Sequence, residues 1–216
     1  MATVLYDYWR SSASYRVRIA LNMLGEEYEI VPVDLLAKTH MSAEHLARNP
    51  QGLVPALHID GRMLTQSLAI IEYLEETRSA GFLPEDAAGR ARVRALAYAI
   101  AMEIHPVCNT RVAAHIVELT GNGDVARKAW MQKFIADGLR AFEAMLDDGG
   151  GTGDFCHGDR PGMAEFCLVP QLYNARRWEV DLSGLERMQR IDRNCSEIAA
   201  FDKAHPDRLG PPPLNS

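Results

Sequence analysis

Residues 10–21 read Arg-Ser-Ser-Ala-Ser-Tyr-Arg-Val-Arg-Ile-Ala-Leu, a polar turn that leads into the start of a helix. The preceding residues 3–8 are rich in β-branched and aromatic side chains, which is typical of a strand. After the turn, apolar residues recur at helical spacing as far as Leu24, and Gly25 suits the position just beyond a helix. The serines are therefore predicted to lie at a strand-to-helix turn, at the start of the first helix.

A helix start of this kind favours an anion, because unpaired backbone N–H groups and the positive end of the helix dipole meet there. Serine hydroxyls beside them can donate to a thiolate, a phosphate or a carboxylate. The structural alternative is that Ser11, Ser12 or Ser14 only caps the helix. The spacing alone leaves both interpretations open.

The composition favours a globular protein of one or two domains. The chain has 216 residues, of which 47% are hydrophobic and 24% are charged, and this suits one or two domains with a sizeable core. A formal net charge of −6 and a pI of about 5.6 argue against a nucleic-acid partner. The N-terminal residues lack a signal-peptide pattern, and no apolar run approaches the ~20 residues that span a membrane. We therefore expect a cytoplasmic protein without membrane segments.

The cysteines and histidines form no metal-binding or redox pattern. The chain contains no Cys-x-x-Cys pair, so neither a zinc site nor a redox pair is predicted, and a disulfide framework is not expected in a chain of this size. His40 and His45 are five residues apart, and no metal site is predicted from them. The widely spaced cysteines are Cys108, Cys156, Cys167 and Cys195.

The first half of the chain alternates strand and helix patterns. Residues 28–33 are predicted to form a second strand parallel to the first, and residues 42–48 a short helix. Asp60-Gly61 lies between two short apolar runs, which predicts a hairpin. Pro55 cannot donate to a strand ladder, so it should lie at the first residue or the edge of a strand.

A third helix is predicted over residues 66–74, with Ser67 as its N-cap. A serine hydroxyl and free helix N–H groups suit a carboxylate ligand. The alternative is an ordinary cap that binds nothing.

The second half of the chain shows only helical periodicity. Residues 79–89 carry glycine, proline and acidic residues, so they are predicted to link two domains, 1–84 and 90–216. Pro106 should kink or end the first helix after the linker. A glycine-rich surface loop is expected at residues 149–153 and a non-helical tail at residues 209–213. The predicted helices span residues 91–104, 112–119, 124–146, 163–178 and 185–201.

The run Arg-Ser-Ser-x-Ser-x-Arg-Val-Arg-Ile-Ala-Leu resembles the signature of zeta-class glutathione transferases, and the similarity continues through nearly the whole chain. The family usually has cysteine where this chain has Ala13. The resemblance implies an α/β plus all-α fold, with a thioredoxin-like domain (βαβ-α-ββα) over residues 1–84 and an all-helical domain over residues 90–216. It also implies that the Val54-Pro55 bond is cis.

A second departure from the family lies at residues 158–165, which resemble a buried helix cap that normally carries threonine or serine and then aspartate. Gly162 offers no side-chain acceptor at the cap position. Glu165 is still expected to reach back to the cap N–H, as half of a capping box.

By the same resemblance, glutathione is the cofactor, and Ser11 contacts its sulfur with Ser12 close by. A serine hydrogen bond to the charged sulfur lowers the pKa of the thiol, and the helix start acts in the same direction. Gln66 and Ser67 match the residues that bind the γ-glutamyl end of glutathione, and His40 falls where relatives contact its glycine end. The remaining expected glutathione contacts are Ala13, Ser14, Val54 and Pro55.

A polar patch in the second half is implied to reach a glutathione across a dimer interface, through His105, Asn109 and Arg111. The alternative is a polar kink that faces solvent. Arg10 can hold a substrate carboxylate in bidentate fashion, or it can be a solvated surface arginine. The family places a carboxylate-binding arginine at the position of Arg177, although a helix end favours cations such as Arg176 and Arg177 in any case.

The implied reaction is the glutathione-dependent cis–trans isomerisation of maleylacetoacetate to fumarylacetoacetate in tyrosine and phenylalanine catabolism. It proceeds by thiolate addition, bond rotation and elimination. The alternatives are isomerisation of maleylpyruvate, and glutathione transfer to or dehalogenation of small α-halo acids. A non-enzymatic module is a further alternative, against which the presence of Ser11, Gln66 and Ser67 argues. The expected partners are a dicarboxylate-like small molecule and a second copy of the chain.

Overall fold

The computed structural model describes residues 2–147 and 151–211, and these divide into two compact units. Unit 1 runs from the N-terminus to Ala80 and resumes at Ser196, and unit 2 spans Gly81–Cys195. The predicted domains, 1–84 and 90–216, assign the last helices to the second domain, whereas the structure groups them with unit 1. This grouping follows from long-range packing, for which helical periodicity contains no signal.

Unit 1 is built on a four-stranded sheet in the order β2-β1-β3-β4. The β1 and β2 strands are parallel, and β3 is antiparallel to both β1 and β4, which confirms the predicted crossover and hairpin. Asp60 and Gly61 both have positive φ, 52° and 73°, as a two-residue hairpin turn of this kind requires. The strands are β1 (Val4–Asp7), β2 (Glu29–Pro32), β3 (Ala56–Ile59) and β4 (Arg62–Thr65).

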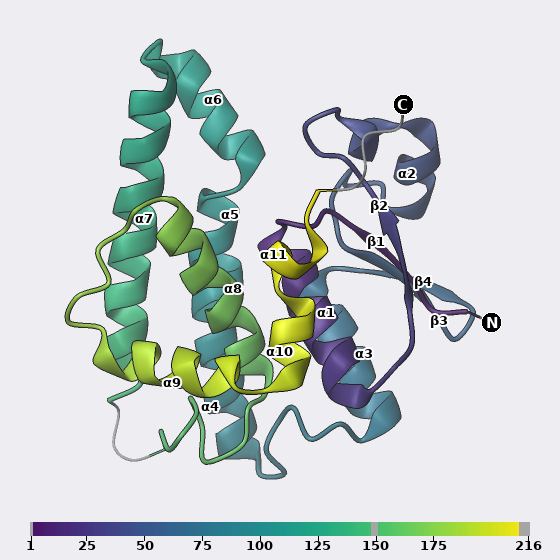
Figure 1. The fold of residues 1–216 in the computed structure, drawn as a ribbon, viewed down its shortest axis with the longest axis vertical. Coiled ribbons are helices and arrows are strands. Elements are labelled where there is room, and N and C mark those ends of the chain that lie inside the picture. Colours follow the sequence, from purple (N-terminus) through teal and green to yellow (C-terminus); the bar gives the residue numbers. More distant parts are fainter. Residues whose placement is uncertain (1, 148–150, 212–216) are drawn as a thin grey trace. The chain divides into compact units, whose positions relative to one another are not determined.

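The register of the sheet gathers three chain segments at one end, which we call the site end. Tyr6 pairs with Ala56, and Ala56 pairs with Thr65. The turn that follows β1, the residues that precede β3 and the helix that follows β4 therefore all leave the sheet at this end (Figure 1). The Val54-Pro55 bond, just before β3, is cis, as the family resemblance implies.

Helix α1 (Ser12–Leu24) contacts both α3 (Ser67–Arg78) and α10 (Ala199–Ala204) within unit 1. The contact with α10 includes two hydrogen bonds, from Arg18 Nε to the Ala204 carbonyl at 3.0 Å and from Asn22 Nδ2 to the Ala200 carbonyl at 3.1 Å. These bonds attach the C-terminal segment to the first helix. The other helices of unit 1 are η1 (Thr39–Met41), α2 (Ala43–Arg48) and α11 (Pro206–Leu209).

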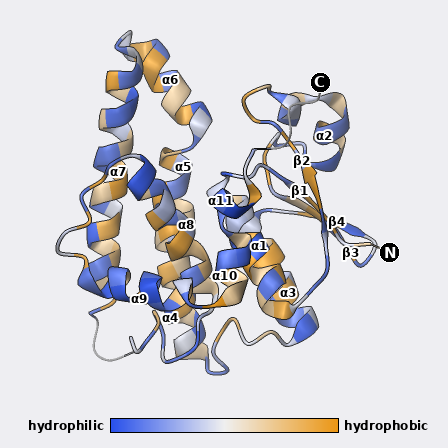
Figure 2. Ribbon diagram, in the orientation of Figure 1, coloured by the Kyte–Doolittle hydropathy of each residue, from blue (hydrophilic) through white to orange (hydrophobic). Residues whose placement is uncertain are grey.

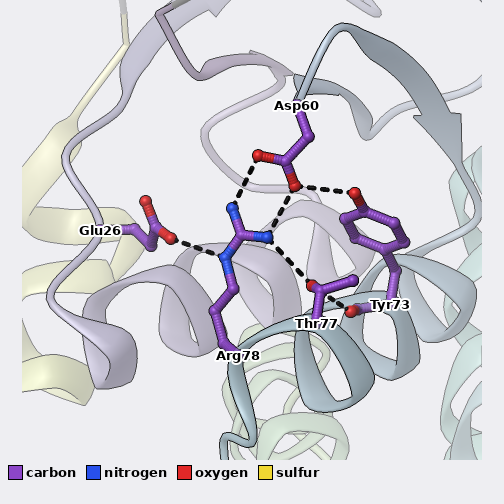
Figure 3. A network of polar contacts seen from close by, with 5 residues as sticks. All are labelled: Glu26, Asp60, Tyr73, Thr77 and Arg78. Atoms are coloured by element: carbon purple, nitrogen blue, oxygen red, sulfur yellow. Dashed lines mark hydrogen bonds and ion pairs between the residues drawn. The ribbon is translucent and has the colours of Figure 1, made fainter.

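A network of polar contacts lies at the β3–β4 turn, at the end of the sheet opposite the site end (Figure 3). Arg78, at the end of α3, donates to both carboxylate oxygens of Asp60 in the β3–β4 turn, at 2.6 and 2.9 Å, and to Glu26 at 3.0 Å. Tyr73 also donates its hydroxyl to Asp60, at 2.7 Å. The hydrogen bonds from Arg78 and Tyr73 lower the pKa of Asp60 to about 2. These hydrogen bonds connect the β3–β4 turn to helix α3.

Unit 2 is formed from helices in which apolar and polar residues alternate, as expected for amphipathic helices (Figure 2). The most buried is α8, in which every residue from Met163 to Leu172 is buried. Within the part of the chain that the structure describes, no helix combines the length and apolar character needed to cross a membrane. The helices are α4 (Ala87–Tyr98), η2 (Ala99–Ile104), α5 (His105–Val107), α6 (Thr110–Thr120), α7 (Gly123–Met145), α8 (Met163–Arg177) and α9 (Glu186–Ser196).

Three predicted boundaries in the second half differ from the structure. The predicted helix over 91–104 becomes a π-helix at Ala99–Ile104, and the chain stays helical through Pro106 as far as Val107. The predicted helix over 185–201 is two helices, α9 and α10, because the chain turns after Ser196. Leu209, placed in the non-helical tail, ends α11. Parts of the predicted glycine loop and tail, residues 149–150 and 212–213, lie outside the described residues.

The expected half capping box at the start of α8 is confirmed. The Gly162 N–H donates to Glu165 Oε2 at 2.7 Å, and the Cys156 N–H donates to Oε1 at 2.6 Å. A Cβ at position 162 would lie 2.4 Å from the Phe82 carbonyl oxygen, so the close approach of two backbone segments requires glycine here. In this structure a serine or threonine at position 162 would therefore require the backbone at Phe82 or at Gly162 to shift.

Candidate active site

The turn after β1 places Ser11 at the N-cap of α1. The Ser11 N–H donates to the Tyr8 carbonyl at 2.7 Å, and Ser11 Oγ accepts the Ser14 N–H at 3.2 Å. Within the part of the chain that the structure describes, the Ser11 hydroxyl hydrogen has no protein acceptor. The capping alternative is therefore observed, yet it uses only the oxygen of the hydroxyl and leaves its hydrogen for a ligand.

The other residues of the serine turn differ in burial. Ser12, the first residue of α1, is half-buried, as Ser11 is. Ala13 is 9% exposed and Ser14 is fully buried. Only Ser11 and Ser12 of this group thus present a hydroxyl near the surface.

Arg10 lies at the edge of the same turn against two aromatic side chains. Its guanidinium lies 4.7 Å from the centre of the Trp9 ring, and Nη2 donates to the Tyr8 hydroxyl at 3.3 Å. Arg10 Nε is buried and has no hydrogen-bond partner among the described residues. The sequence gives no distinct signal for these contacts, because adjacency in the chain does not fix where the side chains of Tyr8, Trp9 and Arg10 lie.

The start of α3 differs from the prediction that Ser67 is its N-cap. Gln66 occupies the N-cap position with φ of 68°, and Ser67 is the first helical residue. Gln66 makes no side-chain cap hydrogen bond, and its Nε2 donates instead to Gln51 Oε1 at 2.6 Å. The positive φ of a non-glycine residue has no signal in a propensity pattern, which is why the boundary was misplaced by one residue.

Ser67 is 5% exposed and accepts a hydrogen bond from Arg16 Nη1 at 3.2 Å. Arg16 lies on α1 and is itself 2% exposed. The burial of Arg16 has no signal in the sequence, because an arginine in an amphipathic helix is usually expected to face solvent. The start of α3 therefore combines backbone N–H groups, a serine hydroxyl and a buried positive charge.

The cis Pro55 is buried at the site end, and Val54 is half-buried beside it. The preceding carbonyl, that of Leu53, lies 2.9 Å from His45 Nε2 and accepts from Asn49 Nδ2 at 2.8 Å. These two bonds hold the segment that enters β3. His40 is half-buried in η1, and burial together with the nearby His45 lowers its pKa.

The remaining predicted site residues belong to unit 2, which is described by itself. Asn109 is the N-cap of α6, where its Oδ1 accepts the Arg111 N–H at 3.1 Å. Arg111 is exposed, and His105 is half-buried in α5. Arg177 is exposed in the last turn of α8, beside Arg176, which forms an ion pair with Asp192 at 2.5 Å.

In unit 1 the register thus brings the Ser11 turn, Val54-Pro55 and the Gln66-Ser67 helix start to one end of the sheet. Two helix starts with serine hydroxyls suit a ligand that carries two separate anionic groups. No group of three or more metal-ligating side chains is found among the described residues. The arrangement is suited to holding and activating an anion rather than to general-base catalysis by the protein.

Comparison with known proteins identifies relatives over nearly the whole chain. A family model described as the N-terminal domain of glutathione S-transferase matches residues 1–76, and one described as the C-terminal domain matches residues 124–213. A maleylacetoacetate isomerase from Rhizobium meliloti (strain 1021) is 66% identical over 210 residues, which are 97% of this chain and 98% of that protein.

Two solved structures are similar in both sequence and fold. One is the holo structure of maleyl pyruvate isomerase, described as a bacterial zeta-class glutathione S-transferase, with a TM-score of 0.92, 41% identity and coverage of 99% of this chain and 100% of that chain. The other is a maleylacetoacetate isomerase from Methylobacterium extorquens AM1 with bound malonate and glutathione, with a TM-score of 0.92, 39% identity and the same coverage.

Proposed function

Because the chain belongs to the zeta class of the glutathione S-transferase family, we propose that it is a glutathione-dependent isomerase that converts maleylacetoacetate to fumarylacetoacetate. The observation that carries this proposal is the pair of serine-bearing helix starts at one end of the sheet, in a chain 66% identical to an isomerase of that name. Glutathione carries both a thiol and a γ-glutamyl carboxylate, so it matches two anion sites.

The residues at the site end fit glutathione. The α1 start offers the Ser11 hydroxyl hydrogen to the sulfur, and the α3 start offers Ser67 and uncapped N–H groups to the γ-glutamyl carboxylate. When bound, glutathione supplies a sulfur nucleophile that adds reversibly to the cis double bond and so allows the bond to rotate. Ser11 stabilises the charged form of that sulfur, which lowers the pKa of the thiol, and Ser12 lies next to it on the same helix.

The substrate is a dianion, and arginines are the residues that we propose to hold it. Arg10 has a buried Nε without a partner among the described residues, so it retains a donor for a carboxylate oxygen. Arg177 is proposed for a second carboxylate, on the strength of the family resemblance and its exposure. Malonate, also a dicarboxylate, is bound in the relative from Methylobacterium extorquens AM1.

We also propose that the active form is a C2 homodimer in which His105, Asn109 and Arg111 contribute to the partner's glutathione site, and that the enzyme acts in tyrosine and phenylalanine catabolism in the cytoplasm. Sedimentation at the protein concentration of the assay should show a dimer. An active monomer at that concentration would contradict this part of the proposal.

The test of the reaction is a direct assay of the purified protein. Isomerisation of maleylacetoacetate should require glutathione, and glutathione should not be consumed, because the sulfur leaves at the end of each turnover. Equal rates with and without glutathione, or stoichiometric loss of free thiol, would refute the proposed mechanism.

The second candidate is isomerisation of maleylpyruvate, which is favoured by the similarity to a solved maleyl pyruvate isomerase. Both acids carry the same cis double bond, so the same residues serve both reactions. The ratio of kcat/KM for the two acids, measured on one preparation, decides between them. We expect the ratio to favour maleylacetoacetate.

A further inference from the structure

Arg16 is a buried arginine that lies between α1 and α3 of unit 1. Its side chain extends from α1, is 2% exposed, and reaches the Ser67 hydroxyl with a 3.2 Å hydrogen bond from Nη1. An arginine side chain is always protonated in proteins and carries only donors. Ser67 Oγ must therefore be the acceptor in this bond.

This direction of the bond fixes how the Ser67 hydroxyl can act. A hydroxyl has one hydrogen, and with its oxygen occupied by Arg16 that hydrogen is available for an acceptor. Among the described residues no protein group accepts it. The hydroxyl is thus held as a donor, which is the role that an anionic ligand at the start of α3 requires.

The start of α3 is also left without anionic or capping side chains. Its first turn contains no acidic residue, and Gln66 makes no side-chain cap bond. The start of α4 shows the contrast, because Asp86 caps it by accepting the Gly89 N–H at 2.8 Å. The positive helix end and the Arg16 charge therefore act together on whatever approaches Ser67.

Arg18, two residues along the same helix, has a different environment. It is fully buried but forms hydrogen bonds with both oxygens of the Asp7 carboxylate, at 2.9 and 2.8 Å. Its charge is compensated within the protein. Arg18 thus donates to a carboxylate, whereas Arg16 donates to a neutral hydroxyl at a helix start.

We propose that Arg16 is a positioning residue for the γ-glutamyl carboxylate of glutathione, acting through the Ser67 hydroxyl and through its own buried charge. The inference rests on the proposed function, because it requires glutathione to be the ligand. It predicts that Arg16 sets the affinity for one carboxylate of glutathione and leaves the sulfur alone.

The experiment compares two thiol ligands by titration calorimetry. One is glutathione, and the other is γ-aminobutyryl-cysteinylglycine, which differs only by lacking the γ-glutamyl α-carboxylate. Wild-type protein should prefer glutathione, and Arg16→Gln should reduce that preference by about tenfold, equivalent to ~1.4 kcal/mol. In a Ser67→Ala background, Arg16→Gln should reduce the preference by less, since the contribution that passes through the Ser67 hydroxyl is already lost.

The controls separate positioning from a general structural effect. Arg18→Lys should lower stability and leave the preference between the two ligands unchanged. The pKa of the bound glutathione thiol, measured by thiolate absorbance, should be the same in wild type and Arg16→Gln. If Arg16→Gln does not fold, Arg16→Lys is tested in its place. It retains the positive charge and should retain part of the preference for glutathione over the ligand without the carboxylate.

The outcomes distinguish this inference from the proposed function. If wild-type protein does not bind glutathione, both are overturned. If it binds glutathione but Arg16→Gln, or Arg16→Lys in its place, keeps the full preference for the carboxylate, the role of Arg16 is refuted and the proposed function stands. Equal weakening of both ligands would also refute it, since that is the result of a purely structural role.

Discussion

The starts of α1 and α3 leave the same end of the sheet and each offers a serine hydroxyl, yet the two hydroxyls are held by different donors. Ser11 Oγ accepts a backbone N–H, that of Ser14, whereas Ser67 Oγ accepts the guanidinium of Arg16. In both cases the oxygen is occupied from within the protein and the hydrogen is left for a ligand. The difference lies in the charge behind each serine.

That difference matches the two ends of the proposed ligand. A thiolate must lose its charge while the sulfur is bonded to the substrate, so a neutral donor stabilises it without holding it too strongly. The γ-glutamyl carboxylate keeps its charge throughout, so a buried cation behind the serine strengthens binding at no cost to turnover. The α1 start is therefore expected to govern the chemical step and the α3 start to govern affinity.

The largest expected effect is that of Ser11→Ala. Loss of a hydrogen bond to a charged sulfur, worth roughly 1.5–3 kcal/mol, should lower kcat by about tenfold to a hundredfold. The pKa of bound glutathione should rise, which thiolate absorbance against pH measures. Ser42→Ala is the matched control, because Ser42 caps α2 by accepting the His45 N–H at the same 3.2 Å. An unchanged thiol pKa in Ser11→Ala would show that Ser11 does not stabilise the charged sulfur.

Ser67→Ala should act on affinity instead. We expect KM for glutathione to rise by about threefold to tenfold, less than a full charged hydrogen bond, because the helix N–H groups remain. At saturating glutathione kcat should be nearly unchanged, as should the thiol pKa. A large fall in kcat at saturating glutathione would show that Ser67 also affects the chemical step and not only the affinity for glutathione.

Arg177→Ala tests whether Arg177 binds the acid substrate independently of the glutathione contacts of Ser11 and Ser67. KM for the acid substrate should rise by several-fold, about as expected for losing one exposed charge contact, while an uncharged alkylating agent should react with glutathione as fast as before. Arg176→Ala is the neighbouring control, since that arginine is paired with Asp192. Equal impairment with charged and neutral substrates would instead make Arg177 a structural cation at the end of α8.

The smallest effect on activity is expected at the opposite end of the sheet. Asp60→Asn should lower the melting temperature at neutral pH and leave the affinity for glutathione unchanged. The folded-state pKa of Asp60, about 2, lies below its unfolded value, so its stabilising effect is complete above about pH 4 and is lost as the pH falls towards 2. The difference in melting temperature between wild type and Asp60→Asn should shrink over that interval. A constant difference would rule out the ionised Asp60 as its source.

The strands, the hairpin and the serine turn were predictable because each has a local cause. Asp60-Gly61 needs positive φ at both positions, and the strand-to-helix pattern around Ser11 is periodic on either side. The family motif added the cis Pro55, which local pattern alone does not indicate. These features account for the architecture of unit 1 up to residue 80.

The residues that escaped prediction depend on contacts between distant segments. Arg16 and Arg18 are buried, and they donate hydrogen bonds to Ser67 and Asp7. Both acceptors lie outside α1, so the sequence of the helix does not indicate them. The position of Gln66 at the N-cap depends on an unusual backbone angle. The contact between α10 and α1 joins residues nearly two hundred positions apart. The predicted linker therefore divides the chain into 1–84 and 90–216, whereas packing groups the segment from Ser196 onward with unit 1.

That attachment has a consequence for how the protein is made. Unit 1 is discontinuous in sequence, so residues 2–80 leave the ribosome seconds before the α10 segment that packs on α1, with all of unit 2 synthesised between them. During that interval the carbonyl acceptors that Arg18 and Asn22 use in α10 do not yet exist. Helix α1, with Ser11 at its N-cap, therefore gains these two hydrogen bonds only after α10 has been synthesised. A nascent chain stalled before residue 196 lacks both of them.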